Sequence, residues 1–386
     1  MKMSDPKTSV PSSHFDLYTK FYAQALRLAT SSSSNLDNDA KITSDEVVAN
    51  AKSRNQKIII TLDTITKLIF GLDEKNKTNV VLYGGGALEL VIALVKSSCF
   101  DDLDKELATE FKNKIQTSAM KAVKTCSIRN PAGRSRARAA GVVSFLKEVL
   151  DRAVLESDSN DVIAEEGFTT LAAICLGDDL NALQSSIMFK PLLSKSKTVF
   201  PDAKSMHQKT LYLETLFAAV EKEQEKLIQS ITKANGCEKT GLHIFFENID
   251  ECEKEIRIGF GHIEDEKYAM SNKHYKHALS LLSPYLSHTS LLDELMVEIR
   301  SKKAQAAMEI GKFDECLEDT SLLLERKDTA EENLRINLLK LHAKALTMLG
   351  REEEGKEVLA KLKLLSPQSE QEISQQLKDN VKIDAK

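Results

Sequence analysis

The sequence has no tryptophan, few other aromatic residues, and little glycine or proline. Aromatic residues make up 5% of its 386 residues, and it holds 15 glycines and 7 prolines. Because aromatic residues favour strands, and glycine and proline favour tight turns, this scarcity argues against a β-rich fold. The chain is rich instead in alanine, leucine, lysine and glutamate, which favour helices. Composition therefore predicts an all-α protein.

The cysteines and the net charge exclude further classes of protein. Six cysteines are scattered along the chain without a C-x-x-C pair, and most lie in apolar helical patterns. This distribution favours reduced, buried thiols over a disulfide framework, so we expect a cytoplasmic protein, with the nucleus as the alternative. A net charge of −5 spread over the chain lacks the strongly basic footprint of a dedicated nucleic-acid-binding protein. We therefore do not expect nucleic acid as the main partner.

Long apolar runs are also missing. No stretch approaches the roughly 18 uninterrupted apolar residues that suggest a membrane-spanning helix. Residues 1–13 are polar and lack the apolar run of a signal peptide. We expect no membrane span and no cleaved leader.

Motifs for catalysis or metal binding are absent as well. Gly84, Gly85 and Gly86 lie outside any known phosphate-binding motif, so we interpret them as a turn into the next helix. His274 and His277 are three residues apart, but no third ligand is near them in the sequence, which favours a solvated helix end over a metal site. We expect no catalytic residue, no metal and no cofactor, and hence no enzyme.

The chain does contain helical periodicity and internal repetition. Its length favours two domains or one elongated solenoid, and its 42% of hydrophobic residues can form a well-buried interior. A Ser/Lys-rich stretch after residue 193 indicates a boundary. We expect a disordered tail over 1–13, helical repeats over 14–193, a linker with connecting helices over 194–258, further repeats over 259–367, and a capping helix or tail over 368–386.

The repeats of the first half combine an alanine-rich helix, a turn and an apolar helix. Residues 118–128 lead through a turn at 130–133 to Gly141 and the apolar stretch 142–150, and a similar pattern returns over 166–193. A partial copy begins at Gly86.

This pattern resembles the armadillo repeat family, or a more relaxed HEAT-like stack. Gly141 matches the glycine that begins the last helix of the family's motif, and Asn130 and Asn181 match the asparagine after its second helix. Small residues match those of its inner helix, namely Ala122, Ala172 and Ala173. The spacing is longer than the family's repeat of about 40 residues, and Ile187 or Met188 takes the place of a third glycine.

The last third holds a second repeat. The segments 272–279, 310–317 and 349–356 align on one another. Ala304 and Cys316 lie on either side of Gly311, and Ala343 and Gly355 lie at the same spacing around Gly350. Such small residues allow two antiparallel helices to cross closely, and a glycine turn lets the chain reverse between them.

These segments resemble the tetratricopeptide repeat over residues 259–367, although the repeats exceed the family's usual length of about 34 residues. In the first unit, Glu266 stands where the small residue belongs and Lys273 where the turn glycine would be. With the armadillo-like half, the resemblance implies an α-α superhelix with a concave groove for protein partners.

The inner face of the first helices is the expected partner-binding surface. It comprises Lys267, Ser301, Gln305, Lys340 and Lys344. Lys340 and Lys344 are one helical turn apart and point the same way, so they suit the acidic end of a peptide, or serve solubility alone. Many tetratricopeptide co-chaperones hold the C-terminal carboxylate of heat-shock chaperones with pairs of polar or charged residues four apart. The corresponding positions here are Ile263 with Lys267 and Asn337 with Leu341. Because these pairs do not match, binding of chaperone tails is disfavoured.

A cluster of arginines is the second candidate. Arg129, Arg134, Arg136 and Arg138 are close in sequence, and guanidinium groups grip phosphate or carboxylate through forked hydrogen bonds. The alternative is an exposed loop without a ligand.

The sequence therefore predicts a non-catalytic scaffold or adaptor that binds an extended peptide or a helix of a partner protein. One alternative is a co-chaperone that assists folding or assembly of a client. Another is binding of an anionic ligand, nucleic acid or phospholipid, by the arginine cluster, which steep salt dependence would reveal.

Overall fold

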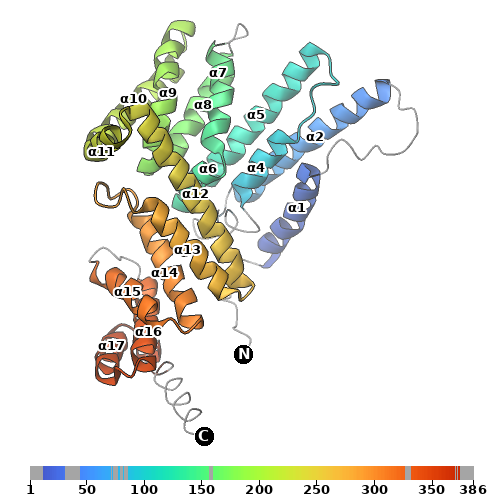
Figure 1. Ribbon diagram of the computed structural model, residues 1–386. Coiled ribbons are helices and arrows are strands. Elements are labelled where there is room, and N and C mark those ends of the chain that lie inside the picture. Colours follow the sequence, from blue (N-terminus) through green and yellow to red (C-terminus); the bar gives the residue numbers. More distant parts are fainter. Residues whose placement is uncertain are drawn as a thin grey trace. The chain divides into compact units, whose positions relative to one another are not determined.

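The computed structural model shows an all-α protein, as composition predicts (Figure 1). It describes residues 12–30, 44–70, 72, 77–78, 81, 86–155, 160–326, 332–369, 371 and 373, and these contain no strand. No helix in this part of the chain is long and apolar enough to cross a membrane. Most of both predicted tails, as well as Gly84 and Gly85, lies outside the described residues, and the first helix already begins at Ser12.

The chain divides into two compact units, Met1–Glu225 and Lys226–Lys386. Helices of unit 1, with the labels of Figure 1, are α1 (Ser12–Thr30), α2 (Ser44–Ile69), α4 (Ala87–Lys96), α5 (Lys105–Ser127), α6 (Pro131–Ala139), α7 (Val142–Leu155), α8 (Asp161–Cys175), α9 (Asp179–Val199) and α10 (Lys204–Glu223). Helices of unit 2 are α12 (Glu238–Glu264), α13 (Tyr268–Leu282), α14 (Asp293–Glu309), α15 (Phe313–Glu325), α16 (Glu332–Met348) and α17 (Glu352–Leu365), and α11 (Glu225–Asn235) begins at the division.

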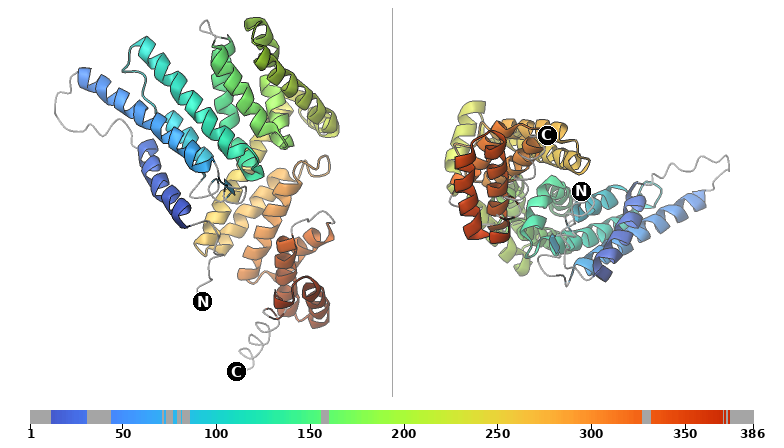
Figure 2. Two further views of the ribbon diagram at one scale, coloured as in Figure 1. Left: turned by 180° about the vertical axis from the view of Figure 1, so that it is seen from behind. Right: turned by 90° about the horizontal axis from the view of Figure 1, so that it is seen from below.

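Unit 1 packs its helices in two layers. Helices α1, α4, α7 and α9 follow one another in one layer, and α2, α5, α8 and α10 in the other (Figures 1 and 2). Apolar side chains between the layers are completely buried, among them Leu62, Leu88, Met120, Leu146 and Phe168. Burial of this apolar stripe, rather than helix propensity alone, stabilises each helix. The assignment to armadillo-like or HEAT-like repeats stays a prediction.

The turns after α5 and α8 have the same backbone conformation. Arg129 (φ 53°) and Gly177 (φ 72°) both lie in the left-handed region, and Asn130 and Asp178 follow them as N-caps of α6 and α9. This equivalence places Asn181 opposite Gly133, so Asn130 and Asn181 are not matching positions as the sequence suggested.

The two asparagines nevertheless bind corresponding carbonyl groups. The Asn130 Nδ2 donates to the Cys126 carbonyl (2.9 Å), and the Asn181 Nδ2 donates to the Ile174 carbonyl (3.0 Å). In the first turn, a Cβ on Gly133 would lie 2.1 Å from that Cys126 oxygen. Glycine is therefore required there, because the side chain of Asn130 already reaches this carbonyl.

The predicted boundary at 193/194 is wrong, because α9 runs without interruption from Asp179 to Val199. Pro191 lies inside it, and the expected turn at Ile187 or Met188 does not form. The Ser/Lys-rich stretch is the solvent-facing side of the last helical turns, where Leu193 and Ser196 are buried between exposed residues. A polar composition with helical periodicity is an exposed helix face, not a linker.

The predicted boundary at 258/259 is also wrong, because it falls inside α12. Gly259 lies inside this helix, on the side that faces α13. It lies against the ring of Tyr275, and a Cβ there would be 3.0 Å from the ring carbon Cζ. The glycine serves the close approach of α12 and α13.

In the described part of unit 2, helices α12 to α17 form three hairpins, α12–α13, α14–α15 and α16–α17. All three close with the same turn. Glu266, Gly311 and Gly350 lie in the left-handed region, with φ of 58°, 74° and 75°. The amide of the next residue in each case donates to a carbonyl five residues back, at 2.7–2.9 Å, which is the Schellman arrangement.

This equivalence corrects the register predicted for the first hairpin. Glu266 occupies the turn, not the place of a small residue, and Lys273 lies inside α13. The buried small residues are Gly259, Ala304 and Ala343 in the first helices, and Ser271, Cys316 and Gly355 in the second helices. The sequence alignment failed because no glycine marks the first turn and because the connection at 283–292 is longer than the one at 326–331.

Candidate partner-binding surfaces

Four of the five predicted partner-binding residues lie at equivalent positions of successive hairpins. Ser301 and Gln305 on α14 correspond to Lys340 and Lys344 on α16, counted from the turns at Gly311 and Gly350. All four side chains are half-buried. The Ser301 hydroxyl donates to the Glu298 carbonyl at 2.9 Å, and Lys344 makes no ion pair within the described residues.

The structure does not place Lys267 with these residues. Lys267 is the N-cap of α13, and its Nζ lies 2.9 Å from Asp265 Oδ2 in the turn, where both side chains are more than half exposed. The positions equivalent to Ser301 and Gln305 in the first hairpin are instead Ile256 and Phe260. The sequence placed Lys267 on a first helix because it used the incorrect register for this hairpin, and partner binding by Lys267 stays a prediction.

Phe260 and Lys302 are surface residues that the sequence analysis missed. Phe260 is 44% exposed on α12, and the Lys302 Nζ lies 5.4 Å from its ring centroid. This is within the range of a cation–π interaction, and it links the first helices of two hairpins. The only sequence signal was an aromatic residue at a solvent-facing helix position. We call the set Phe260, Ser301, Lys302, Gln305, Lys340 and Lys344 the first-helix face.

Ion pairs within and between the hairpins hold this face in place. Asp319 is completely buried and accepts hydrogen bonds from Arg300 Nη1 and Lys303 Nζ, both at 2.7 Å, which joins α15 to α14. Glu315 accepts from Lys276 Nζ at 2.8 Å and from Asn272 Nδ2 at 3.2 Å, which joins α15 to α13.

The environment of Glu315 favours its charged form. Burial raises the pKa of Glu315, but hydrogen bonds from Lys276, Asn272 and Lys312 outweigh it and lower the pKa to about 2. The carboxylate therefore stays charged at neutral pH and ties two neighbouring hairpins together.

His274 and His277 bind a carboxylate rather than standing free. The Nδ1 of His274 lies 2.6 Å from Glu255 Oε2, and the Nδ1 of His277 lies 3.4 Å from Glu255 Oε1. Burial raises the pKa of Glu255, whereas its bonds to the two histidines lower it below the usual range. Within the described residues no group of three or more metal ligands forms.

The predicted arginine cluster lies mostly on a helix, α6, and not on a loop. Arg129 is exposed in the turn before it. The Arg136 Nε lies 2.5 Å from Glu89 Oε1 on α4, and the Arg134 Nη1 donates to the Ser127 carbonyl at 3.3 Å. These groups therefore make contacts inside unit 1.

Arg138 is buried, with 6% of its surface exposed. Its charge acts on Asp178, the N-cap of α9: burial raises the pKa of Asp178, and hydrogen bonding together with the charges of Arg138 and Arg134 opposes the rise. The structure thus does not present the four arginines as one surface, and anion binding by them stays a prediction.

Comparison with known proteins adds little to this geometry. No family model matches the chain, and no curated protein matches it. Among solved structures, the chain is similar to the TPR domain of P58(IPK), with 13% sequence identity and a TM-score of 0.31 over 97% of this chain and 99% of that one. A similarity of this strength supports no conclusion about function.

Proposed function

We propose that this protein is a non-catalytic scaffold or adaptor that binds an extended peptide or a helix of a partner protein on the first-helix face. The observation that carries the proposal is the alignment of half-buried polar side chains on α14 and α16 with the exposed ring of Phe260 on α12, at equivalent positions of three successive hairpins. Surfaces of this kind vary their side chains without loss of fold, since each hairpin is stabilised by its neighbours.

The chemistry of the face suits a partner segment with both acidic and apolar side chains. Lys340 and Lys344 lie one turn apart on the same side of α16, so both place their positive charge on the first-helix face. Phe260 offers an exposed ring at the other end of the face. Aromatic anchors contribute most of the binding energy in many interfaces, and charged groups mainly set specificity and association rate.

A co-chaperone role that depends on chaperone tails is less well supported. Tetratricopeptide co-chaperones hold a chaperone tail with a polar or charged pair on the first hairpin. When positions are counted back from the turn at Glu266, this pair corresponds to Ile256 and Phe260. Neither side chain carries a charge. A cytoplasmic or nuclear location remains part of the proposal, and the six free cysteines fit a reducing compartment.

Affinity capture of partners from cell lysate tests the proposal. The intact chain is compared with a Lys340→Ala, Lys344→Ala double variant and with a Lys356→Ala, Lys363→Ala control, which removes the same charge from exposed positions of α17. We expect to recover a discrete partner protein with the intact chain and the control variant, but not with the double variant. The affinity of the chain for the isolated binding segment of that partner is then measured. Equal recovery by both variants would contradict the first-helix face as the binding surface, and recovery of nucleic acid in its place would favour the arginine cluster.

A further inference from the structure

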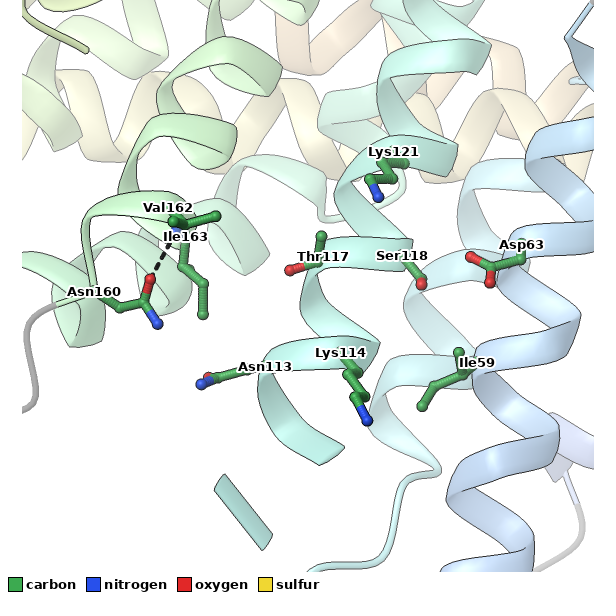
Figure 3. A pocket seen from close by; sticks show the side chains of 10 residues that line it. All are labelled: Ile59, Asp63, Asn113, Lys114, Thr117, Ser118, Lys121, Asn160, Val162 and Ile163. Carbon is green, nitrogen blue, oxygen red and sulfur yellow. Dashed lines mark hydrogen bonds between the residues drawn. The ribbon is translucent and has the colours of Figure 1, made fainter. Parts of the chain in front are cut away.

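Unit 1 contains a hollow that belongs to none of the surfaces described above. It has a volume of about 430 Å³ and lies between α2, α5 and α8 (Figure 3). A second hollow of about 420 Å³ shares Asn113, Asn160 and Ile163 with it. The two hollows therefore adjoin along the amino-terminal half of α5 and the start of α8.

Two asparagine amides are oriented toward the hollow by their other contacts. The Oδ1 of Asn160 accepts from the backbone amide of Ile163 at 3.1 Å and caps α8. The Oδ1 of Asn113 accepts from the Arg152 Nη2 at 3.0 Å. Because both oxygens are occupied, both amide nitrogens remain as donors, and neither has a partner within the described residues.

Two hydroxyl groups line the same hollow. Thr109 and Thr125, on the same helix, each donate to the carbonyl four residues back at 2.8 Å. Thr117 makes no such bond, and its hydroxyl points into the space between α5 and α8 (Figure 3). Ser118 also lines the hollow, but its hydroxyl lies on the side of α5 that faces α2 (Figure 3).

The charges around the hollow favour an anionic ligand between α5 and α8. Lys121 lines the hollow and has no ion pair among the described residues, whereas Lys124, one turn further, binds Glu166 at 2.6 Å. The carboxylate that lines the hollow, Asp63, lies across α5 on α2 (Figure 3). The hollow thus receives donors from Asn113, Thr117, Lys121 and Asn160.

We propose that this hollow binds an aspartate or glutamate side chain on an extended segment of a partner protein. The carboxylate accepts from the Lys121 ammonium, the Thr117 hydroxyl and the two asparagine amides. An aliphatic neighbour of the acidic residue covers Val162, which is 67% exposed at the rim, and Ile163 inside it. A bare anion would leave Val162 in water, so a peptide fits the surface better.

The site shares no residue with the first-helix face. The test of this site is therefore independent of the test of the proposed function. The polar stripe of Asn113, Thr117 and Lys121 repeats every four residues on α5, which was its signal in the sequence.

Methyl NMR spectroscopy of the full chain tests the site. The probes are the peptide Ac-Ala-Leu-Glu-Leu-Ala-NH₂, its glutamine counterpart and inorganic phosphate, and the reporters are the methyl groups of Ile59, Val162 and Ile163. We expect the glutamate peptide to shift these signals with an affinity at least about tenfold higher than the glutamine peptide.

The matched variants are Asn113→Asp and Asn160→Asp. Each variant keeps the side-chain oxygen that accepts from Arg152 or from the Ile163 amide, so we expect the fold to be retained. Each also replaces the amide donor by a negative charge that repels the glutamate of the peptide, so the affinity should fall at least about tenfold. Gln208→Glu, an exposed change of the same charge on α10, should leave the affinity unchanged. The proposal would be overturned if the two peptides bound equally well, or if phosphate caused equal shifts. It would also be overturned if both aspartate variants bound the glutamate peptide as well as the unaltered chain, or if no signal of these methyl groups shifted.

Discussion

Glu266 adopts the same left-handed backbone conformation as Gly311, one hairpin further along the chain. Its φ is 58°, against 74° for Gly311, and the two turns carry the same pattern of amide hydrogen bonds. A residue with a Cβ is strained in this region, whereas glycine is not. The first hairpin therefore closes with a less favourable residue than the second and the third.

Replacing Glu266 by glycine should stabilise unit 2. We expect the free energy of unfolding to rise by about 0.5–1 kcal/mol, because the strain at this position is removed. Gly350→Ala is the matched opposite change and should cost about 1 kcal/mol, since its Cβ meets no atom within 4 Å and only the backbone conformation is affected. Urea unfolding of both variants measures the effect. A loss of stability in the Glu266 variant would contradict the equivalence of the three turns.

The carboxylate of Glu315 should make the stability of unit 2 depend on pH. Its pKa in the folded chain is about 2, below the value of about 4.3 for an unfolded glutamate. The contribution is complete above the unfolded pKa and is lost as the pH falls from there toward 2, because the unfolded chain then takes up a proton that the folded chain does not.

We expect Glu315→Gln to lower the free energy of unfolding by about 1 kcal/mol at neutral pH, and by less at about pH 3. Glu318→Gln, an exposed change on the same helix, is the control. Unfolding in urea at both pH values checks this prediction. An equal loss at both pH values would show that the ion pairs with Lys276 and Lys312 do not stabilise the fold.

Gly133 should tolerate no side chain. In the alanine variant the Cβ would lie 2.1 Å from the Cys126 carbonyl oxygen, so α5 and α6 would have to separate, at a cost of about 2 kcal/mol. Gly261, in α12, has open space around it, and alanine there should stabilise the helix by about 0.5–1 kcal/mol. Thermal unfolding compares the two variants. If the two alanine variants changed the stability in the same direction, the close contact at Gly133 would not explain the effect of the substitution there.

Helical periodicity and glycine positions predicted much of unit 2. Gly311 and Gly350 marked two of the three turns correctly, because only a residue without a Cβ fits there at no cost. The third turn was missed because Glu266 occupies it, and a strained residue carries no sequence signal. That one error moved the first hairpin out of register and placed Lys267 on the wrong surface.

Other features depend on contacts between distant residues and had no local signal. The exposed serines and lysines near the end of α9 resemble a linker until Leu193 and Ser196 are seen to be buried. The arginines of α6 resemble an anion site until Glu89 and Asp178 are seen beside them. The amides of Asn113 and Asn160 become directed donors only through their contacts with Arg152 and the Ile163 amide.

The linear order of contacts in unit 2 affects how it responds to force. Among the described residues of α12 to α17, each hairpin packs mainly on its neighbours in sequence, with α13 on α14 and α15 on α16. Pulling on the chain from its carboxyl end loads the outermost hairpin first, while the inner ones keep their contacts. Under tension, we therefore expect unit 2 to extend in steps of one hairpin, with Phe260 and Lys302 still in their places after the last hairpin has opened.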